Sequence, residues 1–151
     1  MSPTLCSEVV PISEVPVDDL LGAIVDRPMV LVVDDEPLVA DTLAMILTRA
    51  GYRAVRTYDG QTALEIASVQ TPDLLITDVA MPLMNGVELA VSMVSMVPAC
   101  KVVLFSGHAR SADLVRAYDA GHHFPLMSKP MHPSEMLAQV ARSLQRVVVN
   151  A

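Results

Sequence analysis

The sequence predicts an α/β fold, in which one parallel sheet of five strands is covered by five helices on its two faces, a doubly wound arrangement. The first observation is that short apolar runs alternate with segments of helical periodicity, and that this unit occurs five times with short connections. Parallel strands need crossover connections, which are usually helices. The second is a length of 151 residues with 52% hydrophobic but only 3% aromatic residues. This suits one domain with an aliphatic core.

The first strand and helix follow Pro28. Met29–Val33 is a continuous apolar run rich in valine, which is typical of a strand buried on both faces. Pro37 suits a first helical turn, and apolar residues then recur at helical spacing over 38–50 until Gly51 ends the helix. The same alternation predicts strands over 52–56, 74–77, 101–105 and 124–127, and helices over 60–69, 86–96, 110–120 and 133–148.

Residues 1–27 differ from the rest of the chain and are interpreted as an acidic N-terminal extension to a domain over 28–151. Three prolines interrupt them, and no helical or strand period persists, although 17–25 allow a short helix. Five acids against Arg27 give this segment a net charge of -4, out of -7 for the whole chain.

Composition and charge argue against several classes of function. A net charge of -7 disfavours a surface that follows phosphate backbones, so nucleic acid is not expected as a partner. The longest apolar runs are far shorter than the ~20 residues that span a bilayer, so no membrane association is expected. Cys6 and Cys100 lie too far apart to suggest a zinc knuckle or a disulfide framework. We therefore expect a cytoplasmic protein.

Five polar residues stand at or just beyond the carboxyl ends of predicted strands, where open parallel sheets bind their ligands. Three are acids whose mutual repulsion a divalent cation would relieve, and oxygen ligands alone favour magnesium. A lysine and a hydroxyl beside the metal suit a phosphoryl group, and the remaining carboxylate could act as its acceptor. The five residues are Asp34, Asp35, Asp78, Ser106 and Lys129.

Each of these residues, taken singly, also has a simpler explanation. Acids are stabilised at a helix N-terminus by ~0.3–1 kcal/mol, which would account for Asp34 and Asp35. Asp78 precedes residues that favour turns, and Lys129 precedes a proline in a rigid bend. The argument for a site therefore depends on all of them occurring together at strand ends.

Four segments resemble the signature segments of the receiver domain of two-component response regulators, in order and with similar separations. They read VVDDEP at 32–37, LLITDVAMPLMNG at 74–86, FSG at 105–107 and SKP at 128–130. The resemblance extends over about residues 29–148 and implies a flavodoxin-like sheet with the strand order 2-1-3-4-5.

The resemblance also implies a phosphorylation-dependent signalling switch, with no enzymatic activity beyond its own phosphorylation and dephosphorylation. Asp78 would accept the phosphoryl group from a sensor histidine kinase or a histidine phosphotransfer protein. Ser106 would be the switch hydroxyl, and Lys129 would pair with the phosphoryl group. The magnesium ligands would be Asp34, Asp35, Asp78 and the backbone carbonyl of Ala80.

Two positions depart from the family pattern or modify it. The family usually has an aromatic residue three positions before its lysine, and here that position holds Leu126. Phe124 lies on the same face as Leu126 if the strand is regular. His108, two residues after Ser106, is expected to border the mouth of the pocket and to affect access to the phosphoryl group.

Three functions remain open at this point. Few residues follow the helix that ends near 148, so we expect a stand-alone receiver whose output is contact with a downstream protein. The contact face would comprise 110–120, 124–127 and 133–148. A receiver-like interaction module without phosphorylation is the first alternative. An aspartyl-phosphate phosphatase is less favoured, because such enzymes carry a second aspartate where this chain has Ala80.

Overall fold

The computed structural model describes residues 27–107 and 112–145, and the short helix allowed over 17–25 lies outside them. The described residues contain one five-stranded parallel sheet in the order β2-β1-β3-β4-β5, which confirms the predicted fold and strand order. The strands are β1 (Met29–Val33), β2 (Arg53–Thr57), β3 (Leu74–Asp78), β4 (Lys101–Ser106) and β5 (Leu126–Ser128). The helices are α3 (Pro37–Arg49), α4 (Gly60–Val69), α5 (Gly86–Met96), α6 (Ala112–Asp119) and α7 (Pro133–Leu144).

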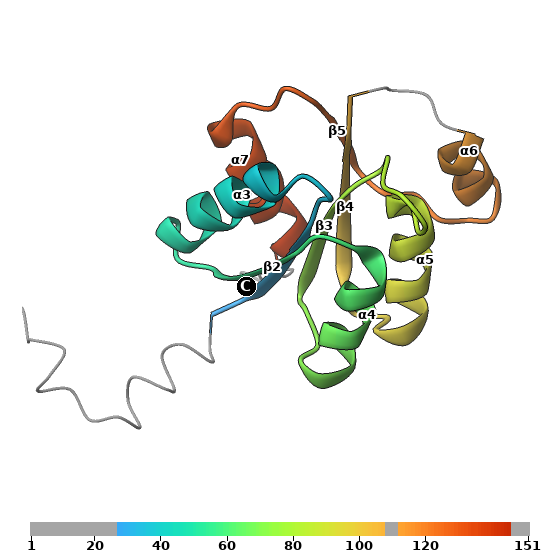
Figure 1. Ribbon diagram of the computed structural model, residues 1–151, viewed down its shortest axis with the longest axis horizontal. Helices are drawn as coiled ribbons and strands as arrows, with labels where there is room; N and C mark the ends of the chain where they lie inside the picture. Colours follow the sequence, from blue (N-terminus) through green and yellow to red (C-terminus); the bar gives the residue numbers. More distant parts are fainter. Residues whose placement is uncertain (1–26, 108–111, 146–151) are drawn as a thin grey trace, which may run out of the picture.

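The helices divide between the two faces of the sheet, with α3 and α7 on one side and α4, α5 and α6 on the other (Figure 1). Alternate residues of each strand point to opposite faces, and this alternation creates two cores. Val30, Ile76 and Phe105 belong to the core beneath α3 and α7. Leu31 and Leu75 belong to the core on the other face, beneath α4, α5 and α6. The three central strands are therefore buried on both faces, as their continuous apolar runs predict.

Several helices begin with side-chain caps at the edge of the sheet where the strands end. The Asp59 Oδ1 atom accepts a hydrogen bond from the Thr62 N–H at 2.7 Å at the start of α4. Asn85 and Glu88 form a reciprocal capping box at the start of α5. These caps satisfy N–H groups that have no partner within the helix, and they hold the loops that surround the carboxyl ends of the strands.

The structure differs from the sequence-based boundaries at the C-terminal end of the domain. The last strand begins at Leu126, two residues later than predicted, because Phe124 packs against a core without belonging to the strand. An apolar residue directly before an apolar run extends the strand that the sequence predicts. Helix α6 spans Ala112–Asp119 and α7 ends at Leu144, whereas the predictions extend over 110–120 and 133–148. Residues 110, 111 and 146–148 lie outside the described part of the chain.

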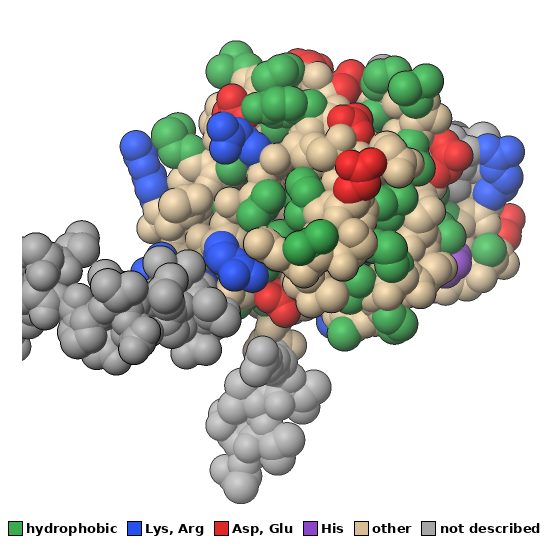
Figure 2. All heavy atoms as spheres, turned by 60° about the horizontal axis from the view of Figure 1, so that its bottom comes forward, with side chains coloured by type: hydrophobic (Ala, Val, Ile, Leu, Met, Phe, Trp, Pro, Cys, Tyr) green, Lys and Arg blue, Asp and Glu red, His purple; other side chains and the backbone are tan. Residues whose placement is uncertain are grey.

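The surface carries charges of both signs. On the face shown in Figure 2, the described lysine and arginine side chains lie apart from one another among acidic and apolar groups, and do not form a continuous tract. Among the described residues, no helix is long and apolar enough to cross a membrane.

Candidate functional site

The strand order brings the predicted polar residues to one edge of the sheet. Asp34 and Asp35 directly follow β1, and Asp78 and Ser106 are the last residues of β3 and β4. Lys129 directly follows β5. Since β1, β3, β4 and β5 are adjacent in the sheet, their carboxyl ends collect these five side chains from segments that are far apart in the sequence.

Three carboxylates form a compact acidic cluster. One oxygen from each of Asp34, Asp35 and Asp78 lies within 4.8 Å of the other two. Asp34 and Asp78 are buried, whereas Asp35 is exposed. Carboxylates at such distances repel one another, and a cation between them removes that cost. The cluster therefore has the geometry to hold a cation at its solvent-facing side.

Lys129 supplies positive charge next to two of these acids. Its Nζ atom lies 3.3 Å from Asp34 Oδ2 and 3.3 Å from Asp78 Oδ2. The Lys129 backbone N–H donates a hydrogen bond of 2.9 Å to the carbonyl oxygen of Ser106. This bond joins the residue to the end of β4, so the lysine is held at its backbone as well as at its ammonium group.

Asp34 and Lys129 have perturbed ionisation. Burial raises the pKa of the Asp34 carboxyl, although the Glu36 N–H and the Lys129 ammonium act in the opposite direction. The Glu36 N–H donates to Asp34 Oδ1 at 2.9 Å. Burial alone would lower the pKa of Lys129, but the charges of Asp34 and Asp78 together outweigh it and raise that pKa. The lysine therefore remains an ammonium group within the site.

The chemistry of the acidic cluster fits magnesium. Magnesium is a hard ion that prefers oxygen ligands and is usually held by one or two carboxylates together with water. Asp34, Asp35 and Asp78 offer carboxylate oxygens at one place, and the exposure of Asp35 leaves the cluster open to solvent. Ala80 is an exposed residue two positions after Asp78, and the role of its carbonyl as a fourth ligand stays a prediction.

Gly86 approaches the backbone of Asp78 closely, which the sequence alone does not predict. A Cβ atom at this position would lie 1.9 Å from the carbonyl oxygen of Asp78. The Gly86 N–H donates to the carbonyl oxygen of Val79 at 2.9 Å, which ties the start of α5 to the end of β3. The Asn85–Gly86 pair in the sequence indicates a turn, but only the folded chain shows that the turn presses against the backbone of Asp78.

The contact of Phe105 with the site is likewise not evident from the sequence. Its ring lies beneath the lysine, with the Lys129 Nζ atom 4.8 Å from the ring centroid. Its position immediately before Ser106, at the end of a buried strand, is the only signal that the sequence offers.

The structure places Leu126 at the first position of β5, with 38% of its surface exposed. It lines a groove together with residues of α6 and of the segment that leads into β5. His108 lies outside the described residues, so its expected position at the pocket mouth stays a prediction.

Comparison with known proteins agrees with this geometry. A family model described as the response regulator receiver domain matches residues 30–141. The transcriptional regulatory protein KdpE of Mycobacterium tuberculosis is 33% identical over 118 residues, which cover 78% of this chain and 51% of that protein. The transcriptional regulatory protein CreB of Escherichia coli is 33% identical over 122 residues, covering 80% of this chain and 52% of that protein.

Among solved structures, a two-component transcriptional regulator AraC from Clostridium phytofermentans is 30% identical, with a TM-score of 0.66, and covers 79% of this chain and 93% of its own. A CheY-like receiver domain protein from Methanospirillum hungatei has a TM-score of 0.73 at 24% identity and shows the same fold, over 79% of this chain and 94% of its own.

The chain spans about half the length of the curated relatives KdpE and CreB. Both are named as transcriptional regulatory proteins, so the comparisons lend no support to the expectation that nucleic acid is excluded as a partner. The family model nevertheless covers most of the sequence, including the four strand ends that carry the five site residues. The chain therefore belongs to the response regulator receiver domain family.

Proposed function

We propose that the chain accepts a phosphoryl group on Asp78 from a sensor histidine kinase or a histidine phosphotransfer protein, and passes the signal on through protein contact. One observation carries this proposal. The Asp78 carboxylate ends the central strand β3, belongs to the three-acid cluster, and lies 3.3 Å from the Lys129 ammonium. Receiver domains act as signalling switches, and this arrangement matches what phosphoryl acceptance requires.

The transfer needs a nucleophile and positive charge on the phosphoryl oxygens. A carboxylate oxygen of Asp78 forms the new O–P bond, while the N–P bond of the donor phosphohistidine breaks and the imidazole nitrogen leaves with the electron pair. The Lys129 ammonium already lies beside that carboxylate, so it neutralises charge on the incoming oxygens. Ser106, at the end of the adjacent strand β4, supplies a hydroxyl for hydrogen bonding to the phosphoryl group.

Receiver domains generally bind magnesium at an acidic pocket, and here Asp34, Asp35 and Asp78 would hold it. When bound, the ion supplies positive charge that offsets the repulsion between the carboxylates and the phosphoryl oxygens. We include the Ala80 carbonyl as a further proposed ligand.

Intact-mass spectrometry after incubation with magnesium and acetyl phosphate tests the proposal. We expect the addition of one phosphate, and its loss in Asp78→Asn. Asp59→Asn is the matched control, because Asp59 is an exposed acid at the same edge of the sheet and asparagine caps helices as well as aspartate does. Labelling that persists in Asp78→Asn, or that is absent from the unsubstituted protein, would contradict phosphoryl acceptance at Asp78.

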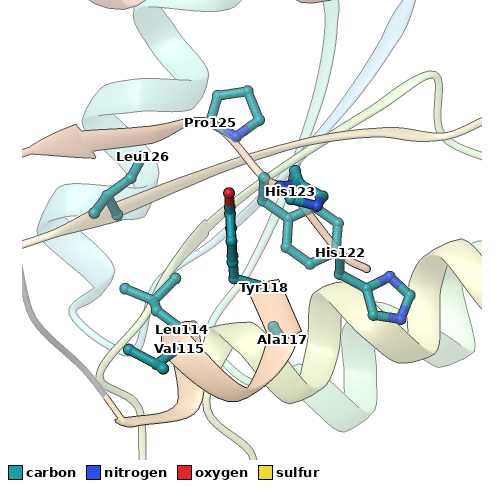
Figure 3. Close-up of a pocket in the computed structure, with 9 residues that line it drawn as sticks. Leu114, Val115, Ala117, Tyr118, His122, His123, Pro125 and Leu126 are labelled. Atoms are coloured by element: carbon teal, nitrogen blue, oxygen red, sulfur yellow. The ribbon is translucent and has the colours of Figure 1, made fainter. Parts of the chain in front are cut away.

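A groove between α6 and β5 supports the proposed protein contact. It is lined by residues from α6 and from the segment that leads into β5, and Tyr118 projects from α6 into it (Figure 3). Val115, Tyr118 and Leu126 are 60%, 62% and 38% exposed. Exposed apolar groups clustered around a groove are typical of a surface that binds another protein. Most of the residues that line the groove belong to the predicted ranges 110–120 and 124–127, and His122 and His123 lie between these ranges.

Hydrogen exchange tests whether this face responds to the site. In protein loaded with magnesium and beryllium fluoride, which mimics a phosphoryl group, we expect altered exchange of backbone amides in α6 and β5. Asp78→Asn should show no such change under the same conditions. Unaltered exchange in both proteins would contradict coupling of this face to phosphorylation.

The exposed position of Leu126 favours one alternative, a receiver-like interaction module that does not depend on phosphorylation. In that case the protein is not labelled by acetyl phosphate, and Asp78→Asn binds partners as the unsubstituted protein does.

A further inference from the structure

We propose that Phe105 is a positioning residue for Lys129. In this proposal the face of its ring holds the ammonium group between Asp34 and Asp78, ready for the phosphoryl oxygens. The inference rests on the proposed function of Asp78. It starts from one contact, the Lys129 Nζ atom at 4.8 Å from the centroid of the Phe105 ring, which lies within the range of about 6 Å where a cation is attracted to an aromatic face.

The distances within the site show why a third contact matters. The ammonium lies equally far, at 3.3 Å, from Asp34 Oδ2 and Asp78 Oδ2. Close ion pairs of this type have N–O distances of about 2.7–2.9 Å. The ammonium is therefore shared between the two carboxylates without a short contact to either, and the ring provides a third attraction.

The surroundings of Phe105 keep the ring in place and strengthen its attraction. Phe105 is 1% exposed and lies in the middle of three adjacent strands, opposite Asp78 on β3 and Met127 on β5. The ring and Lys129 also line one apolar hollow together with Val39 and Leu43 of α3. The ring is buried and the Lys129 side chain is 26% exposed, so the electrostatic attraction between ring and cation is less screened than between two fully exposed groups.

This placement has a consequence for phosphoryl acceptance. An ammonium group held between two carboxylates can contact an oxygen of a phosphoryl group on Asp78 with little movement. Without the ring, the ammonium can close on one carboxylate, and that contact must be broken before the phosphoryl group is bound. Phe105 would therefore affect the rate of phosphorylation without touching the reacting atoms.

The composition of the chain permits a direct spectroscopic test. Lys101 and Lys129 are its two lysines, so selective carbon-13 labelling of lysine yields two ε-methylene signals. In metal-free protein, the ring current of Phe105 should shift the Lys129 signal upfield and leave the Lys101 signal unshifted. Phe105→Leu should lose the upfield shift and Phe124→Leu should keep it, because Phe124 packs in the core on the other face of the sheet. A Lys129 signal that is the same in both variants would overturn the inference.

The kinetic test uses the fact that Phe105 and Phe124 are the two phenylalanines. In a Phe124→Leu background, fluorinated phenylalanines enter at position 105 alone. One to three fluorines weaken the attraction of the ring for a cation while changing its shape little. We expect the rate of labelling by acetyl phosphate to fall stepwise with fluorine number, by about threefold to tenfold in total. Equal rates across the series would overturn the inference, since a role in packing alone does not follow the charge on the ring face.

The two tests separate this inference from the proposed function. One outcome is that the Phe124→Leu protein is not labelled on Asp78 while the unsubstituted protein is labelled. In that case the fluorinated phenylalanines are incorporated site-specifically at position 105 of the otherwise unsubstituted protein, and equal labelling rates would again overturn the inference. If neither protein is labelled, phosphoryl acceptance is wrong, and the ring-current comparison in metal-free protein still decides whether the Phe105 ring lies over Lys129, which the inference requires.

Discussion

Gly86 and Asp78 are in backbone contact: a Cβ atom at Gly86 would lie only 1.9 Å from the carbonyl oxygen of Asp78. The approach places the first turn of α5 directly against the end of β3, where the proposed phosphoryl acceptor lies. The loop between them therefore cannot be displaced without moving the backbone of the site. The absence of a side chain at position 86 is a structural requirement of this arrangement.

We expect Gly86→Ala to lower the free energy of unfolding by at least ~2 kcal/mol, because overpacking against rigid backbone typically costs about 1–3 kcal/mol and relaxation here must move two elements. Urea denaturation measures the change. Gly107→Ala is the control, since a Cβ atom at Gly107 would meet no atom of the described residues within 4 Å. Equal unfolding midpoints for the two variants would show that the contact is not restrictive.

Magnesium should stabilise the folded protein through the acidic cluster. A ligand that binds only the folded state adds ~2.7 kcal/mol at one hundred times its dissociation constant, so thermal unfolding should shift upward with added magnesium. We expect Asp35→Asn to reduce this shift strongly, because it removes one of three clustered carboxylates while leaving the buried ones in place. Glu65→Gln, at an exposed site on α4, should respond to magnesium as the unsubstituted protein does. An undiminished shift in Asp35→Asn would exclude Asp35 as a ligand.

Asp34 should make stability in metal-free buffer depend on pH. Burial is the main reason why its pKa lies above the usual 3.8, and a carboxyl whose pKa is raised by folding stabilises the fold when protonated. That contribution is fully present below pH 3.8 and is lost as the pH rises through the raised pKa. Relative to the unsubstituted protein, Asp34→Asn should therefore gain stability as the pH increases through this range. Urea titrations at a series of pH values measure the difference, and a difference independent of pH would contradict the expectation.

Cys100 should be chemically inert in the folded protein. Its side chain is buried, and burial, together with the charge of Asp73, raises the pKa of its thiol to about 12. The thiolate is the reactive form, so a thiol reagent at pH 8 should modify Cys100 slowly in native protein and rapidly in urea. Cys6→Ser leaves Cys100 as the single thiol. Above pH 9 the stability should also fall, because the unfolded thiol loses its proton first. Reaction at the same rate with and without urea would show that Cys100 is accessible.

Local patterns were sufficient to predict most of the elements. Met29–Val33 is apolar at every position and is buried on both faces. Asp59 and Asn85 cap α4 and α5, and a proline stands in the first turn of both α3 and α7. The predicted boundary was wrong where an apolar residue outside a strand packs against a core as a strand residue would, as Phe124 does before β5. Hydrophobic periodicity indicates which side chains are buried, but it does not indicate whether the backbone is hydrogen-bonded to a neighbouring strand.

The candidate site was predictable in its composition, and only in part in its geometry. Asp34 and Asp78 stand at strand ends in the sequence, and the resemblance to receiver domains supplied the strand order that joins them. Lys129 contacts Asp34 across 95 residues of sequence, and Phe105 lies beneath its ammonium. Such contacts depend on the register between strands and on side-chain packing between elements, which local periodicity does not encode. Which groups stand at the strand ends follows from the order of residues along the chain. The distances between these groups, and the ring beneath the ammonium, follow from strand register and packing in the folded chain.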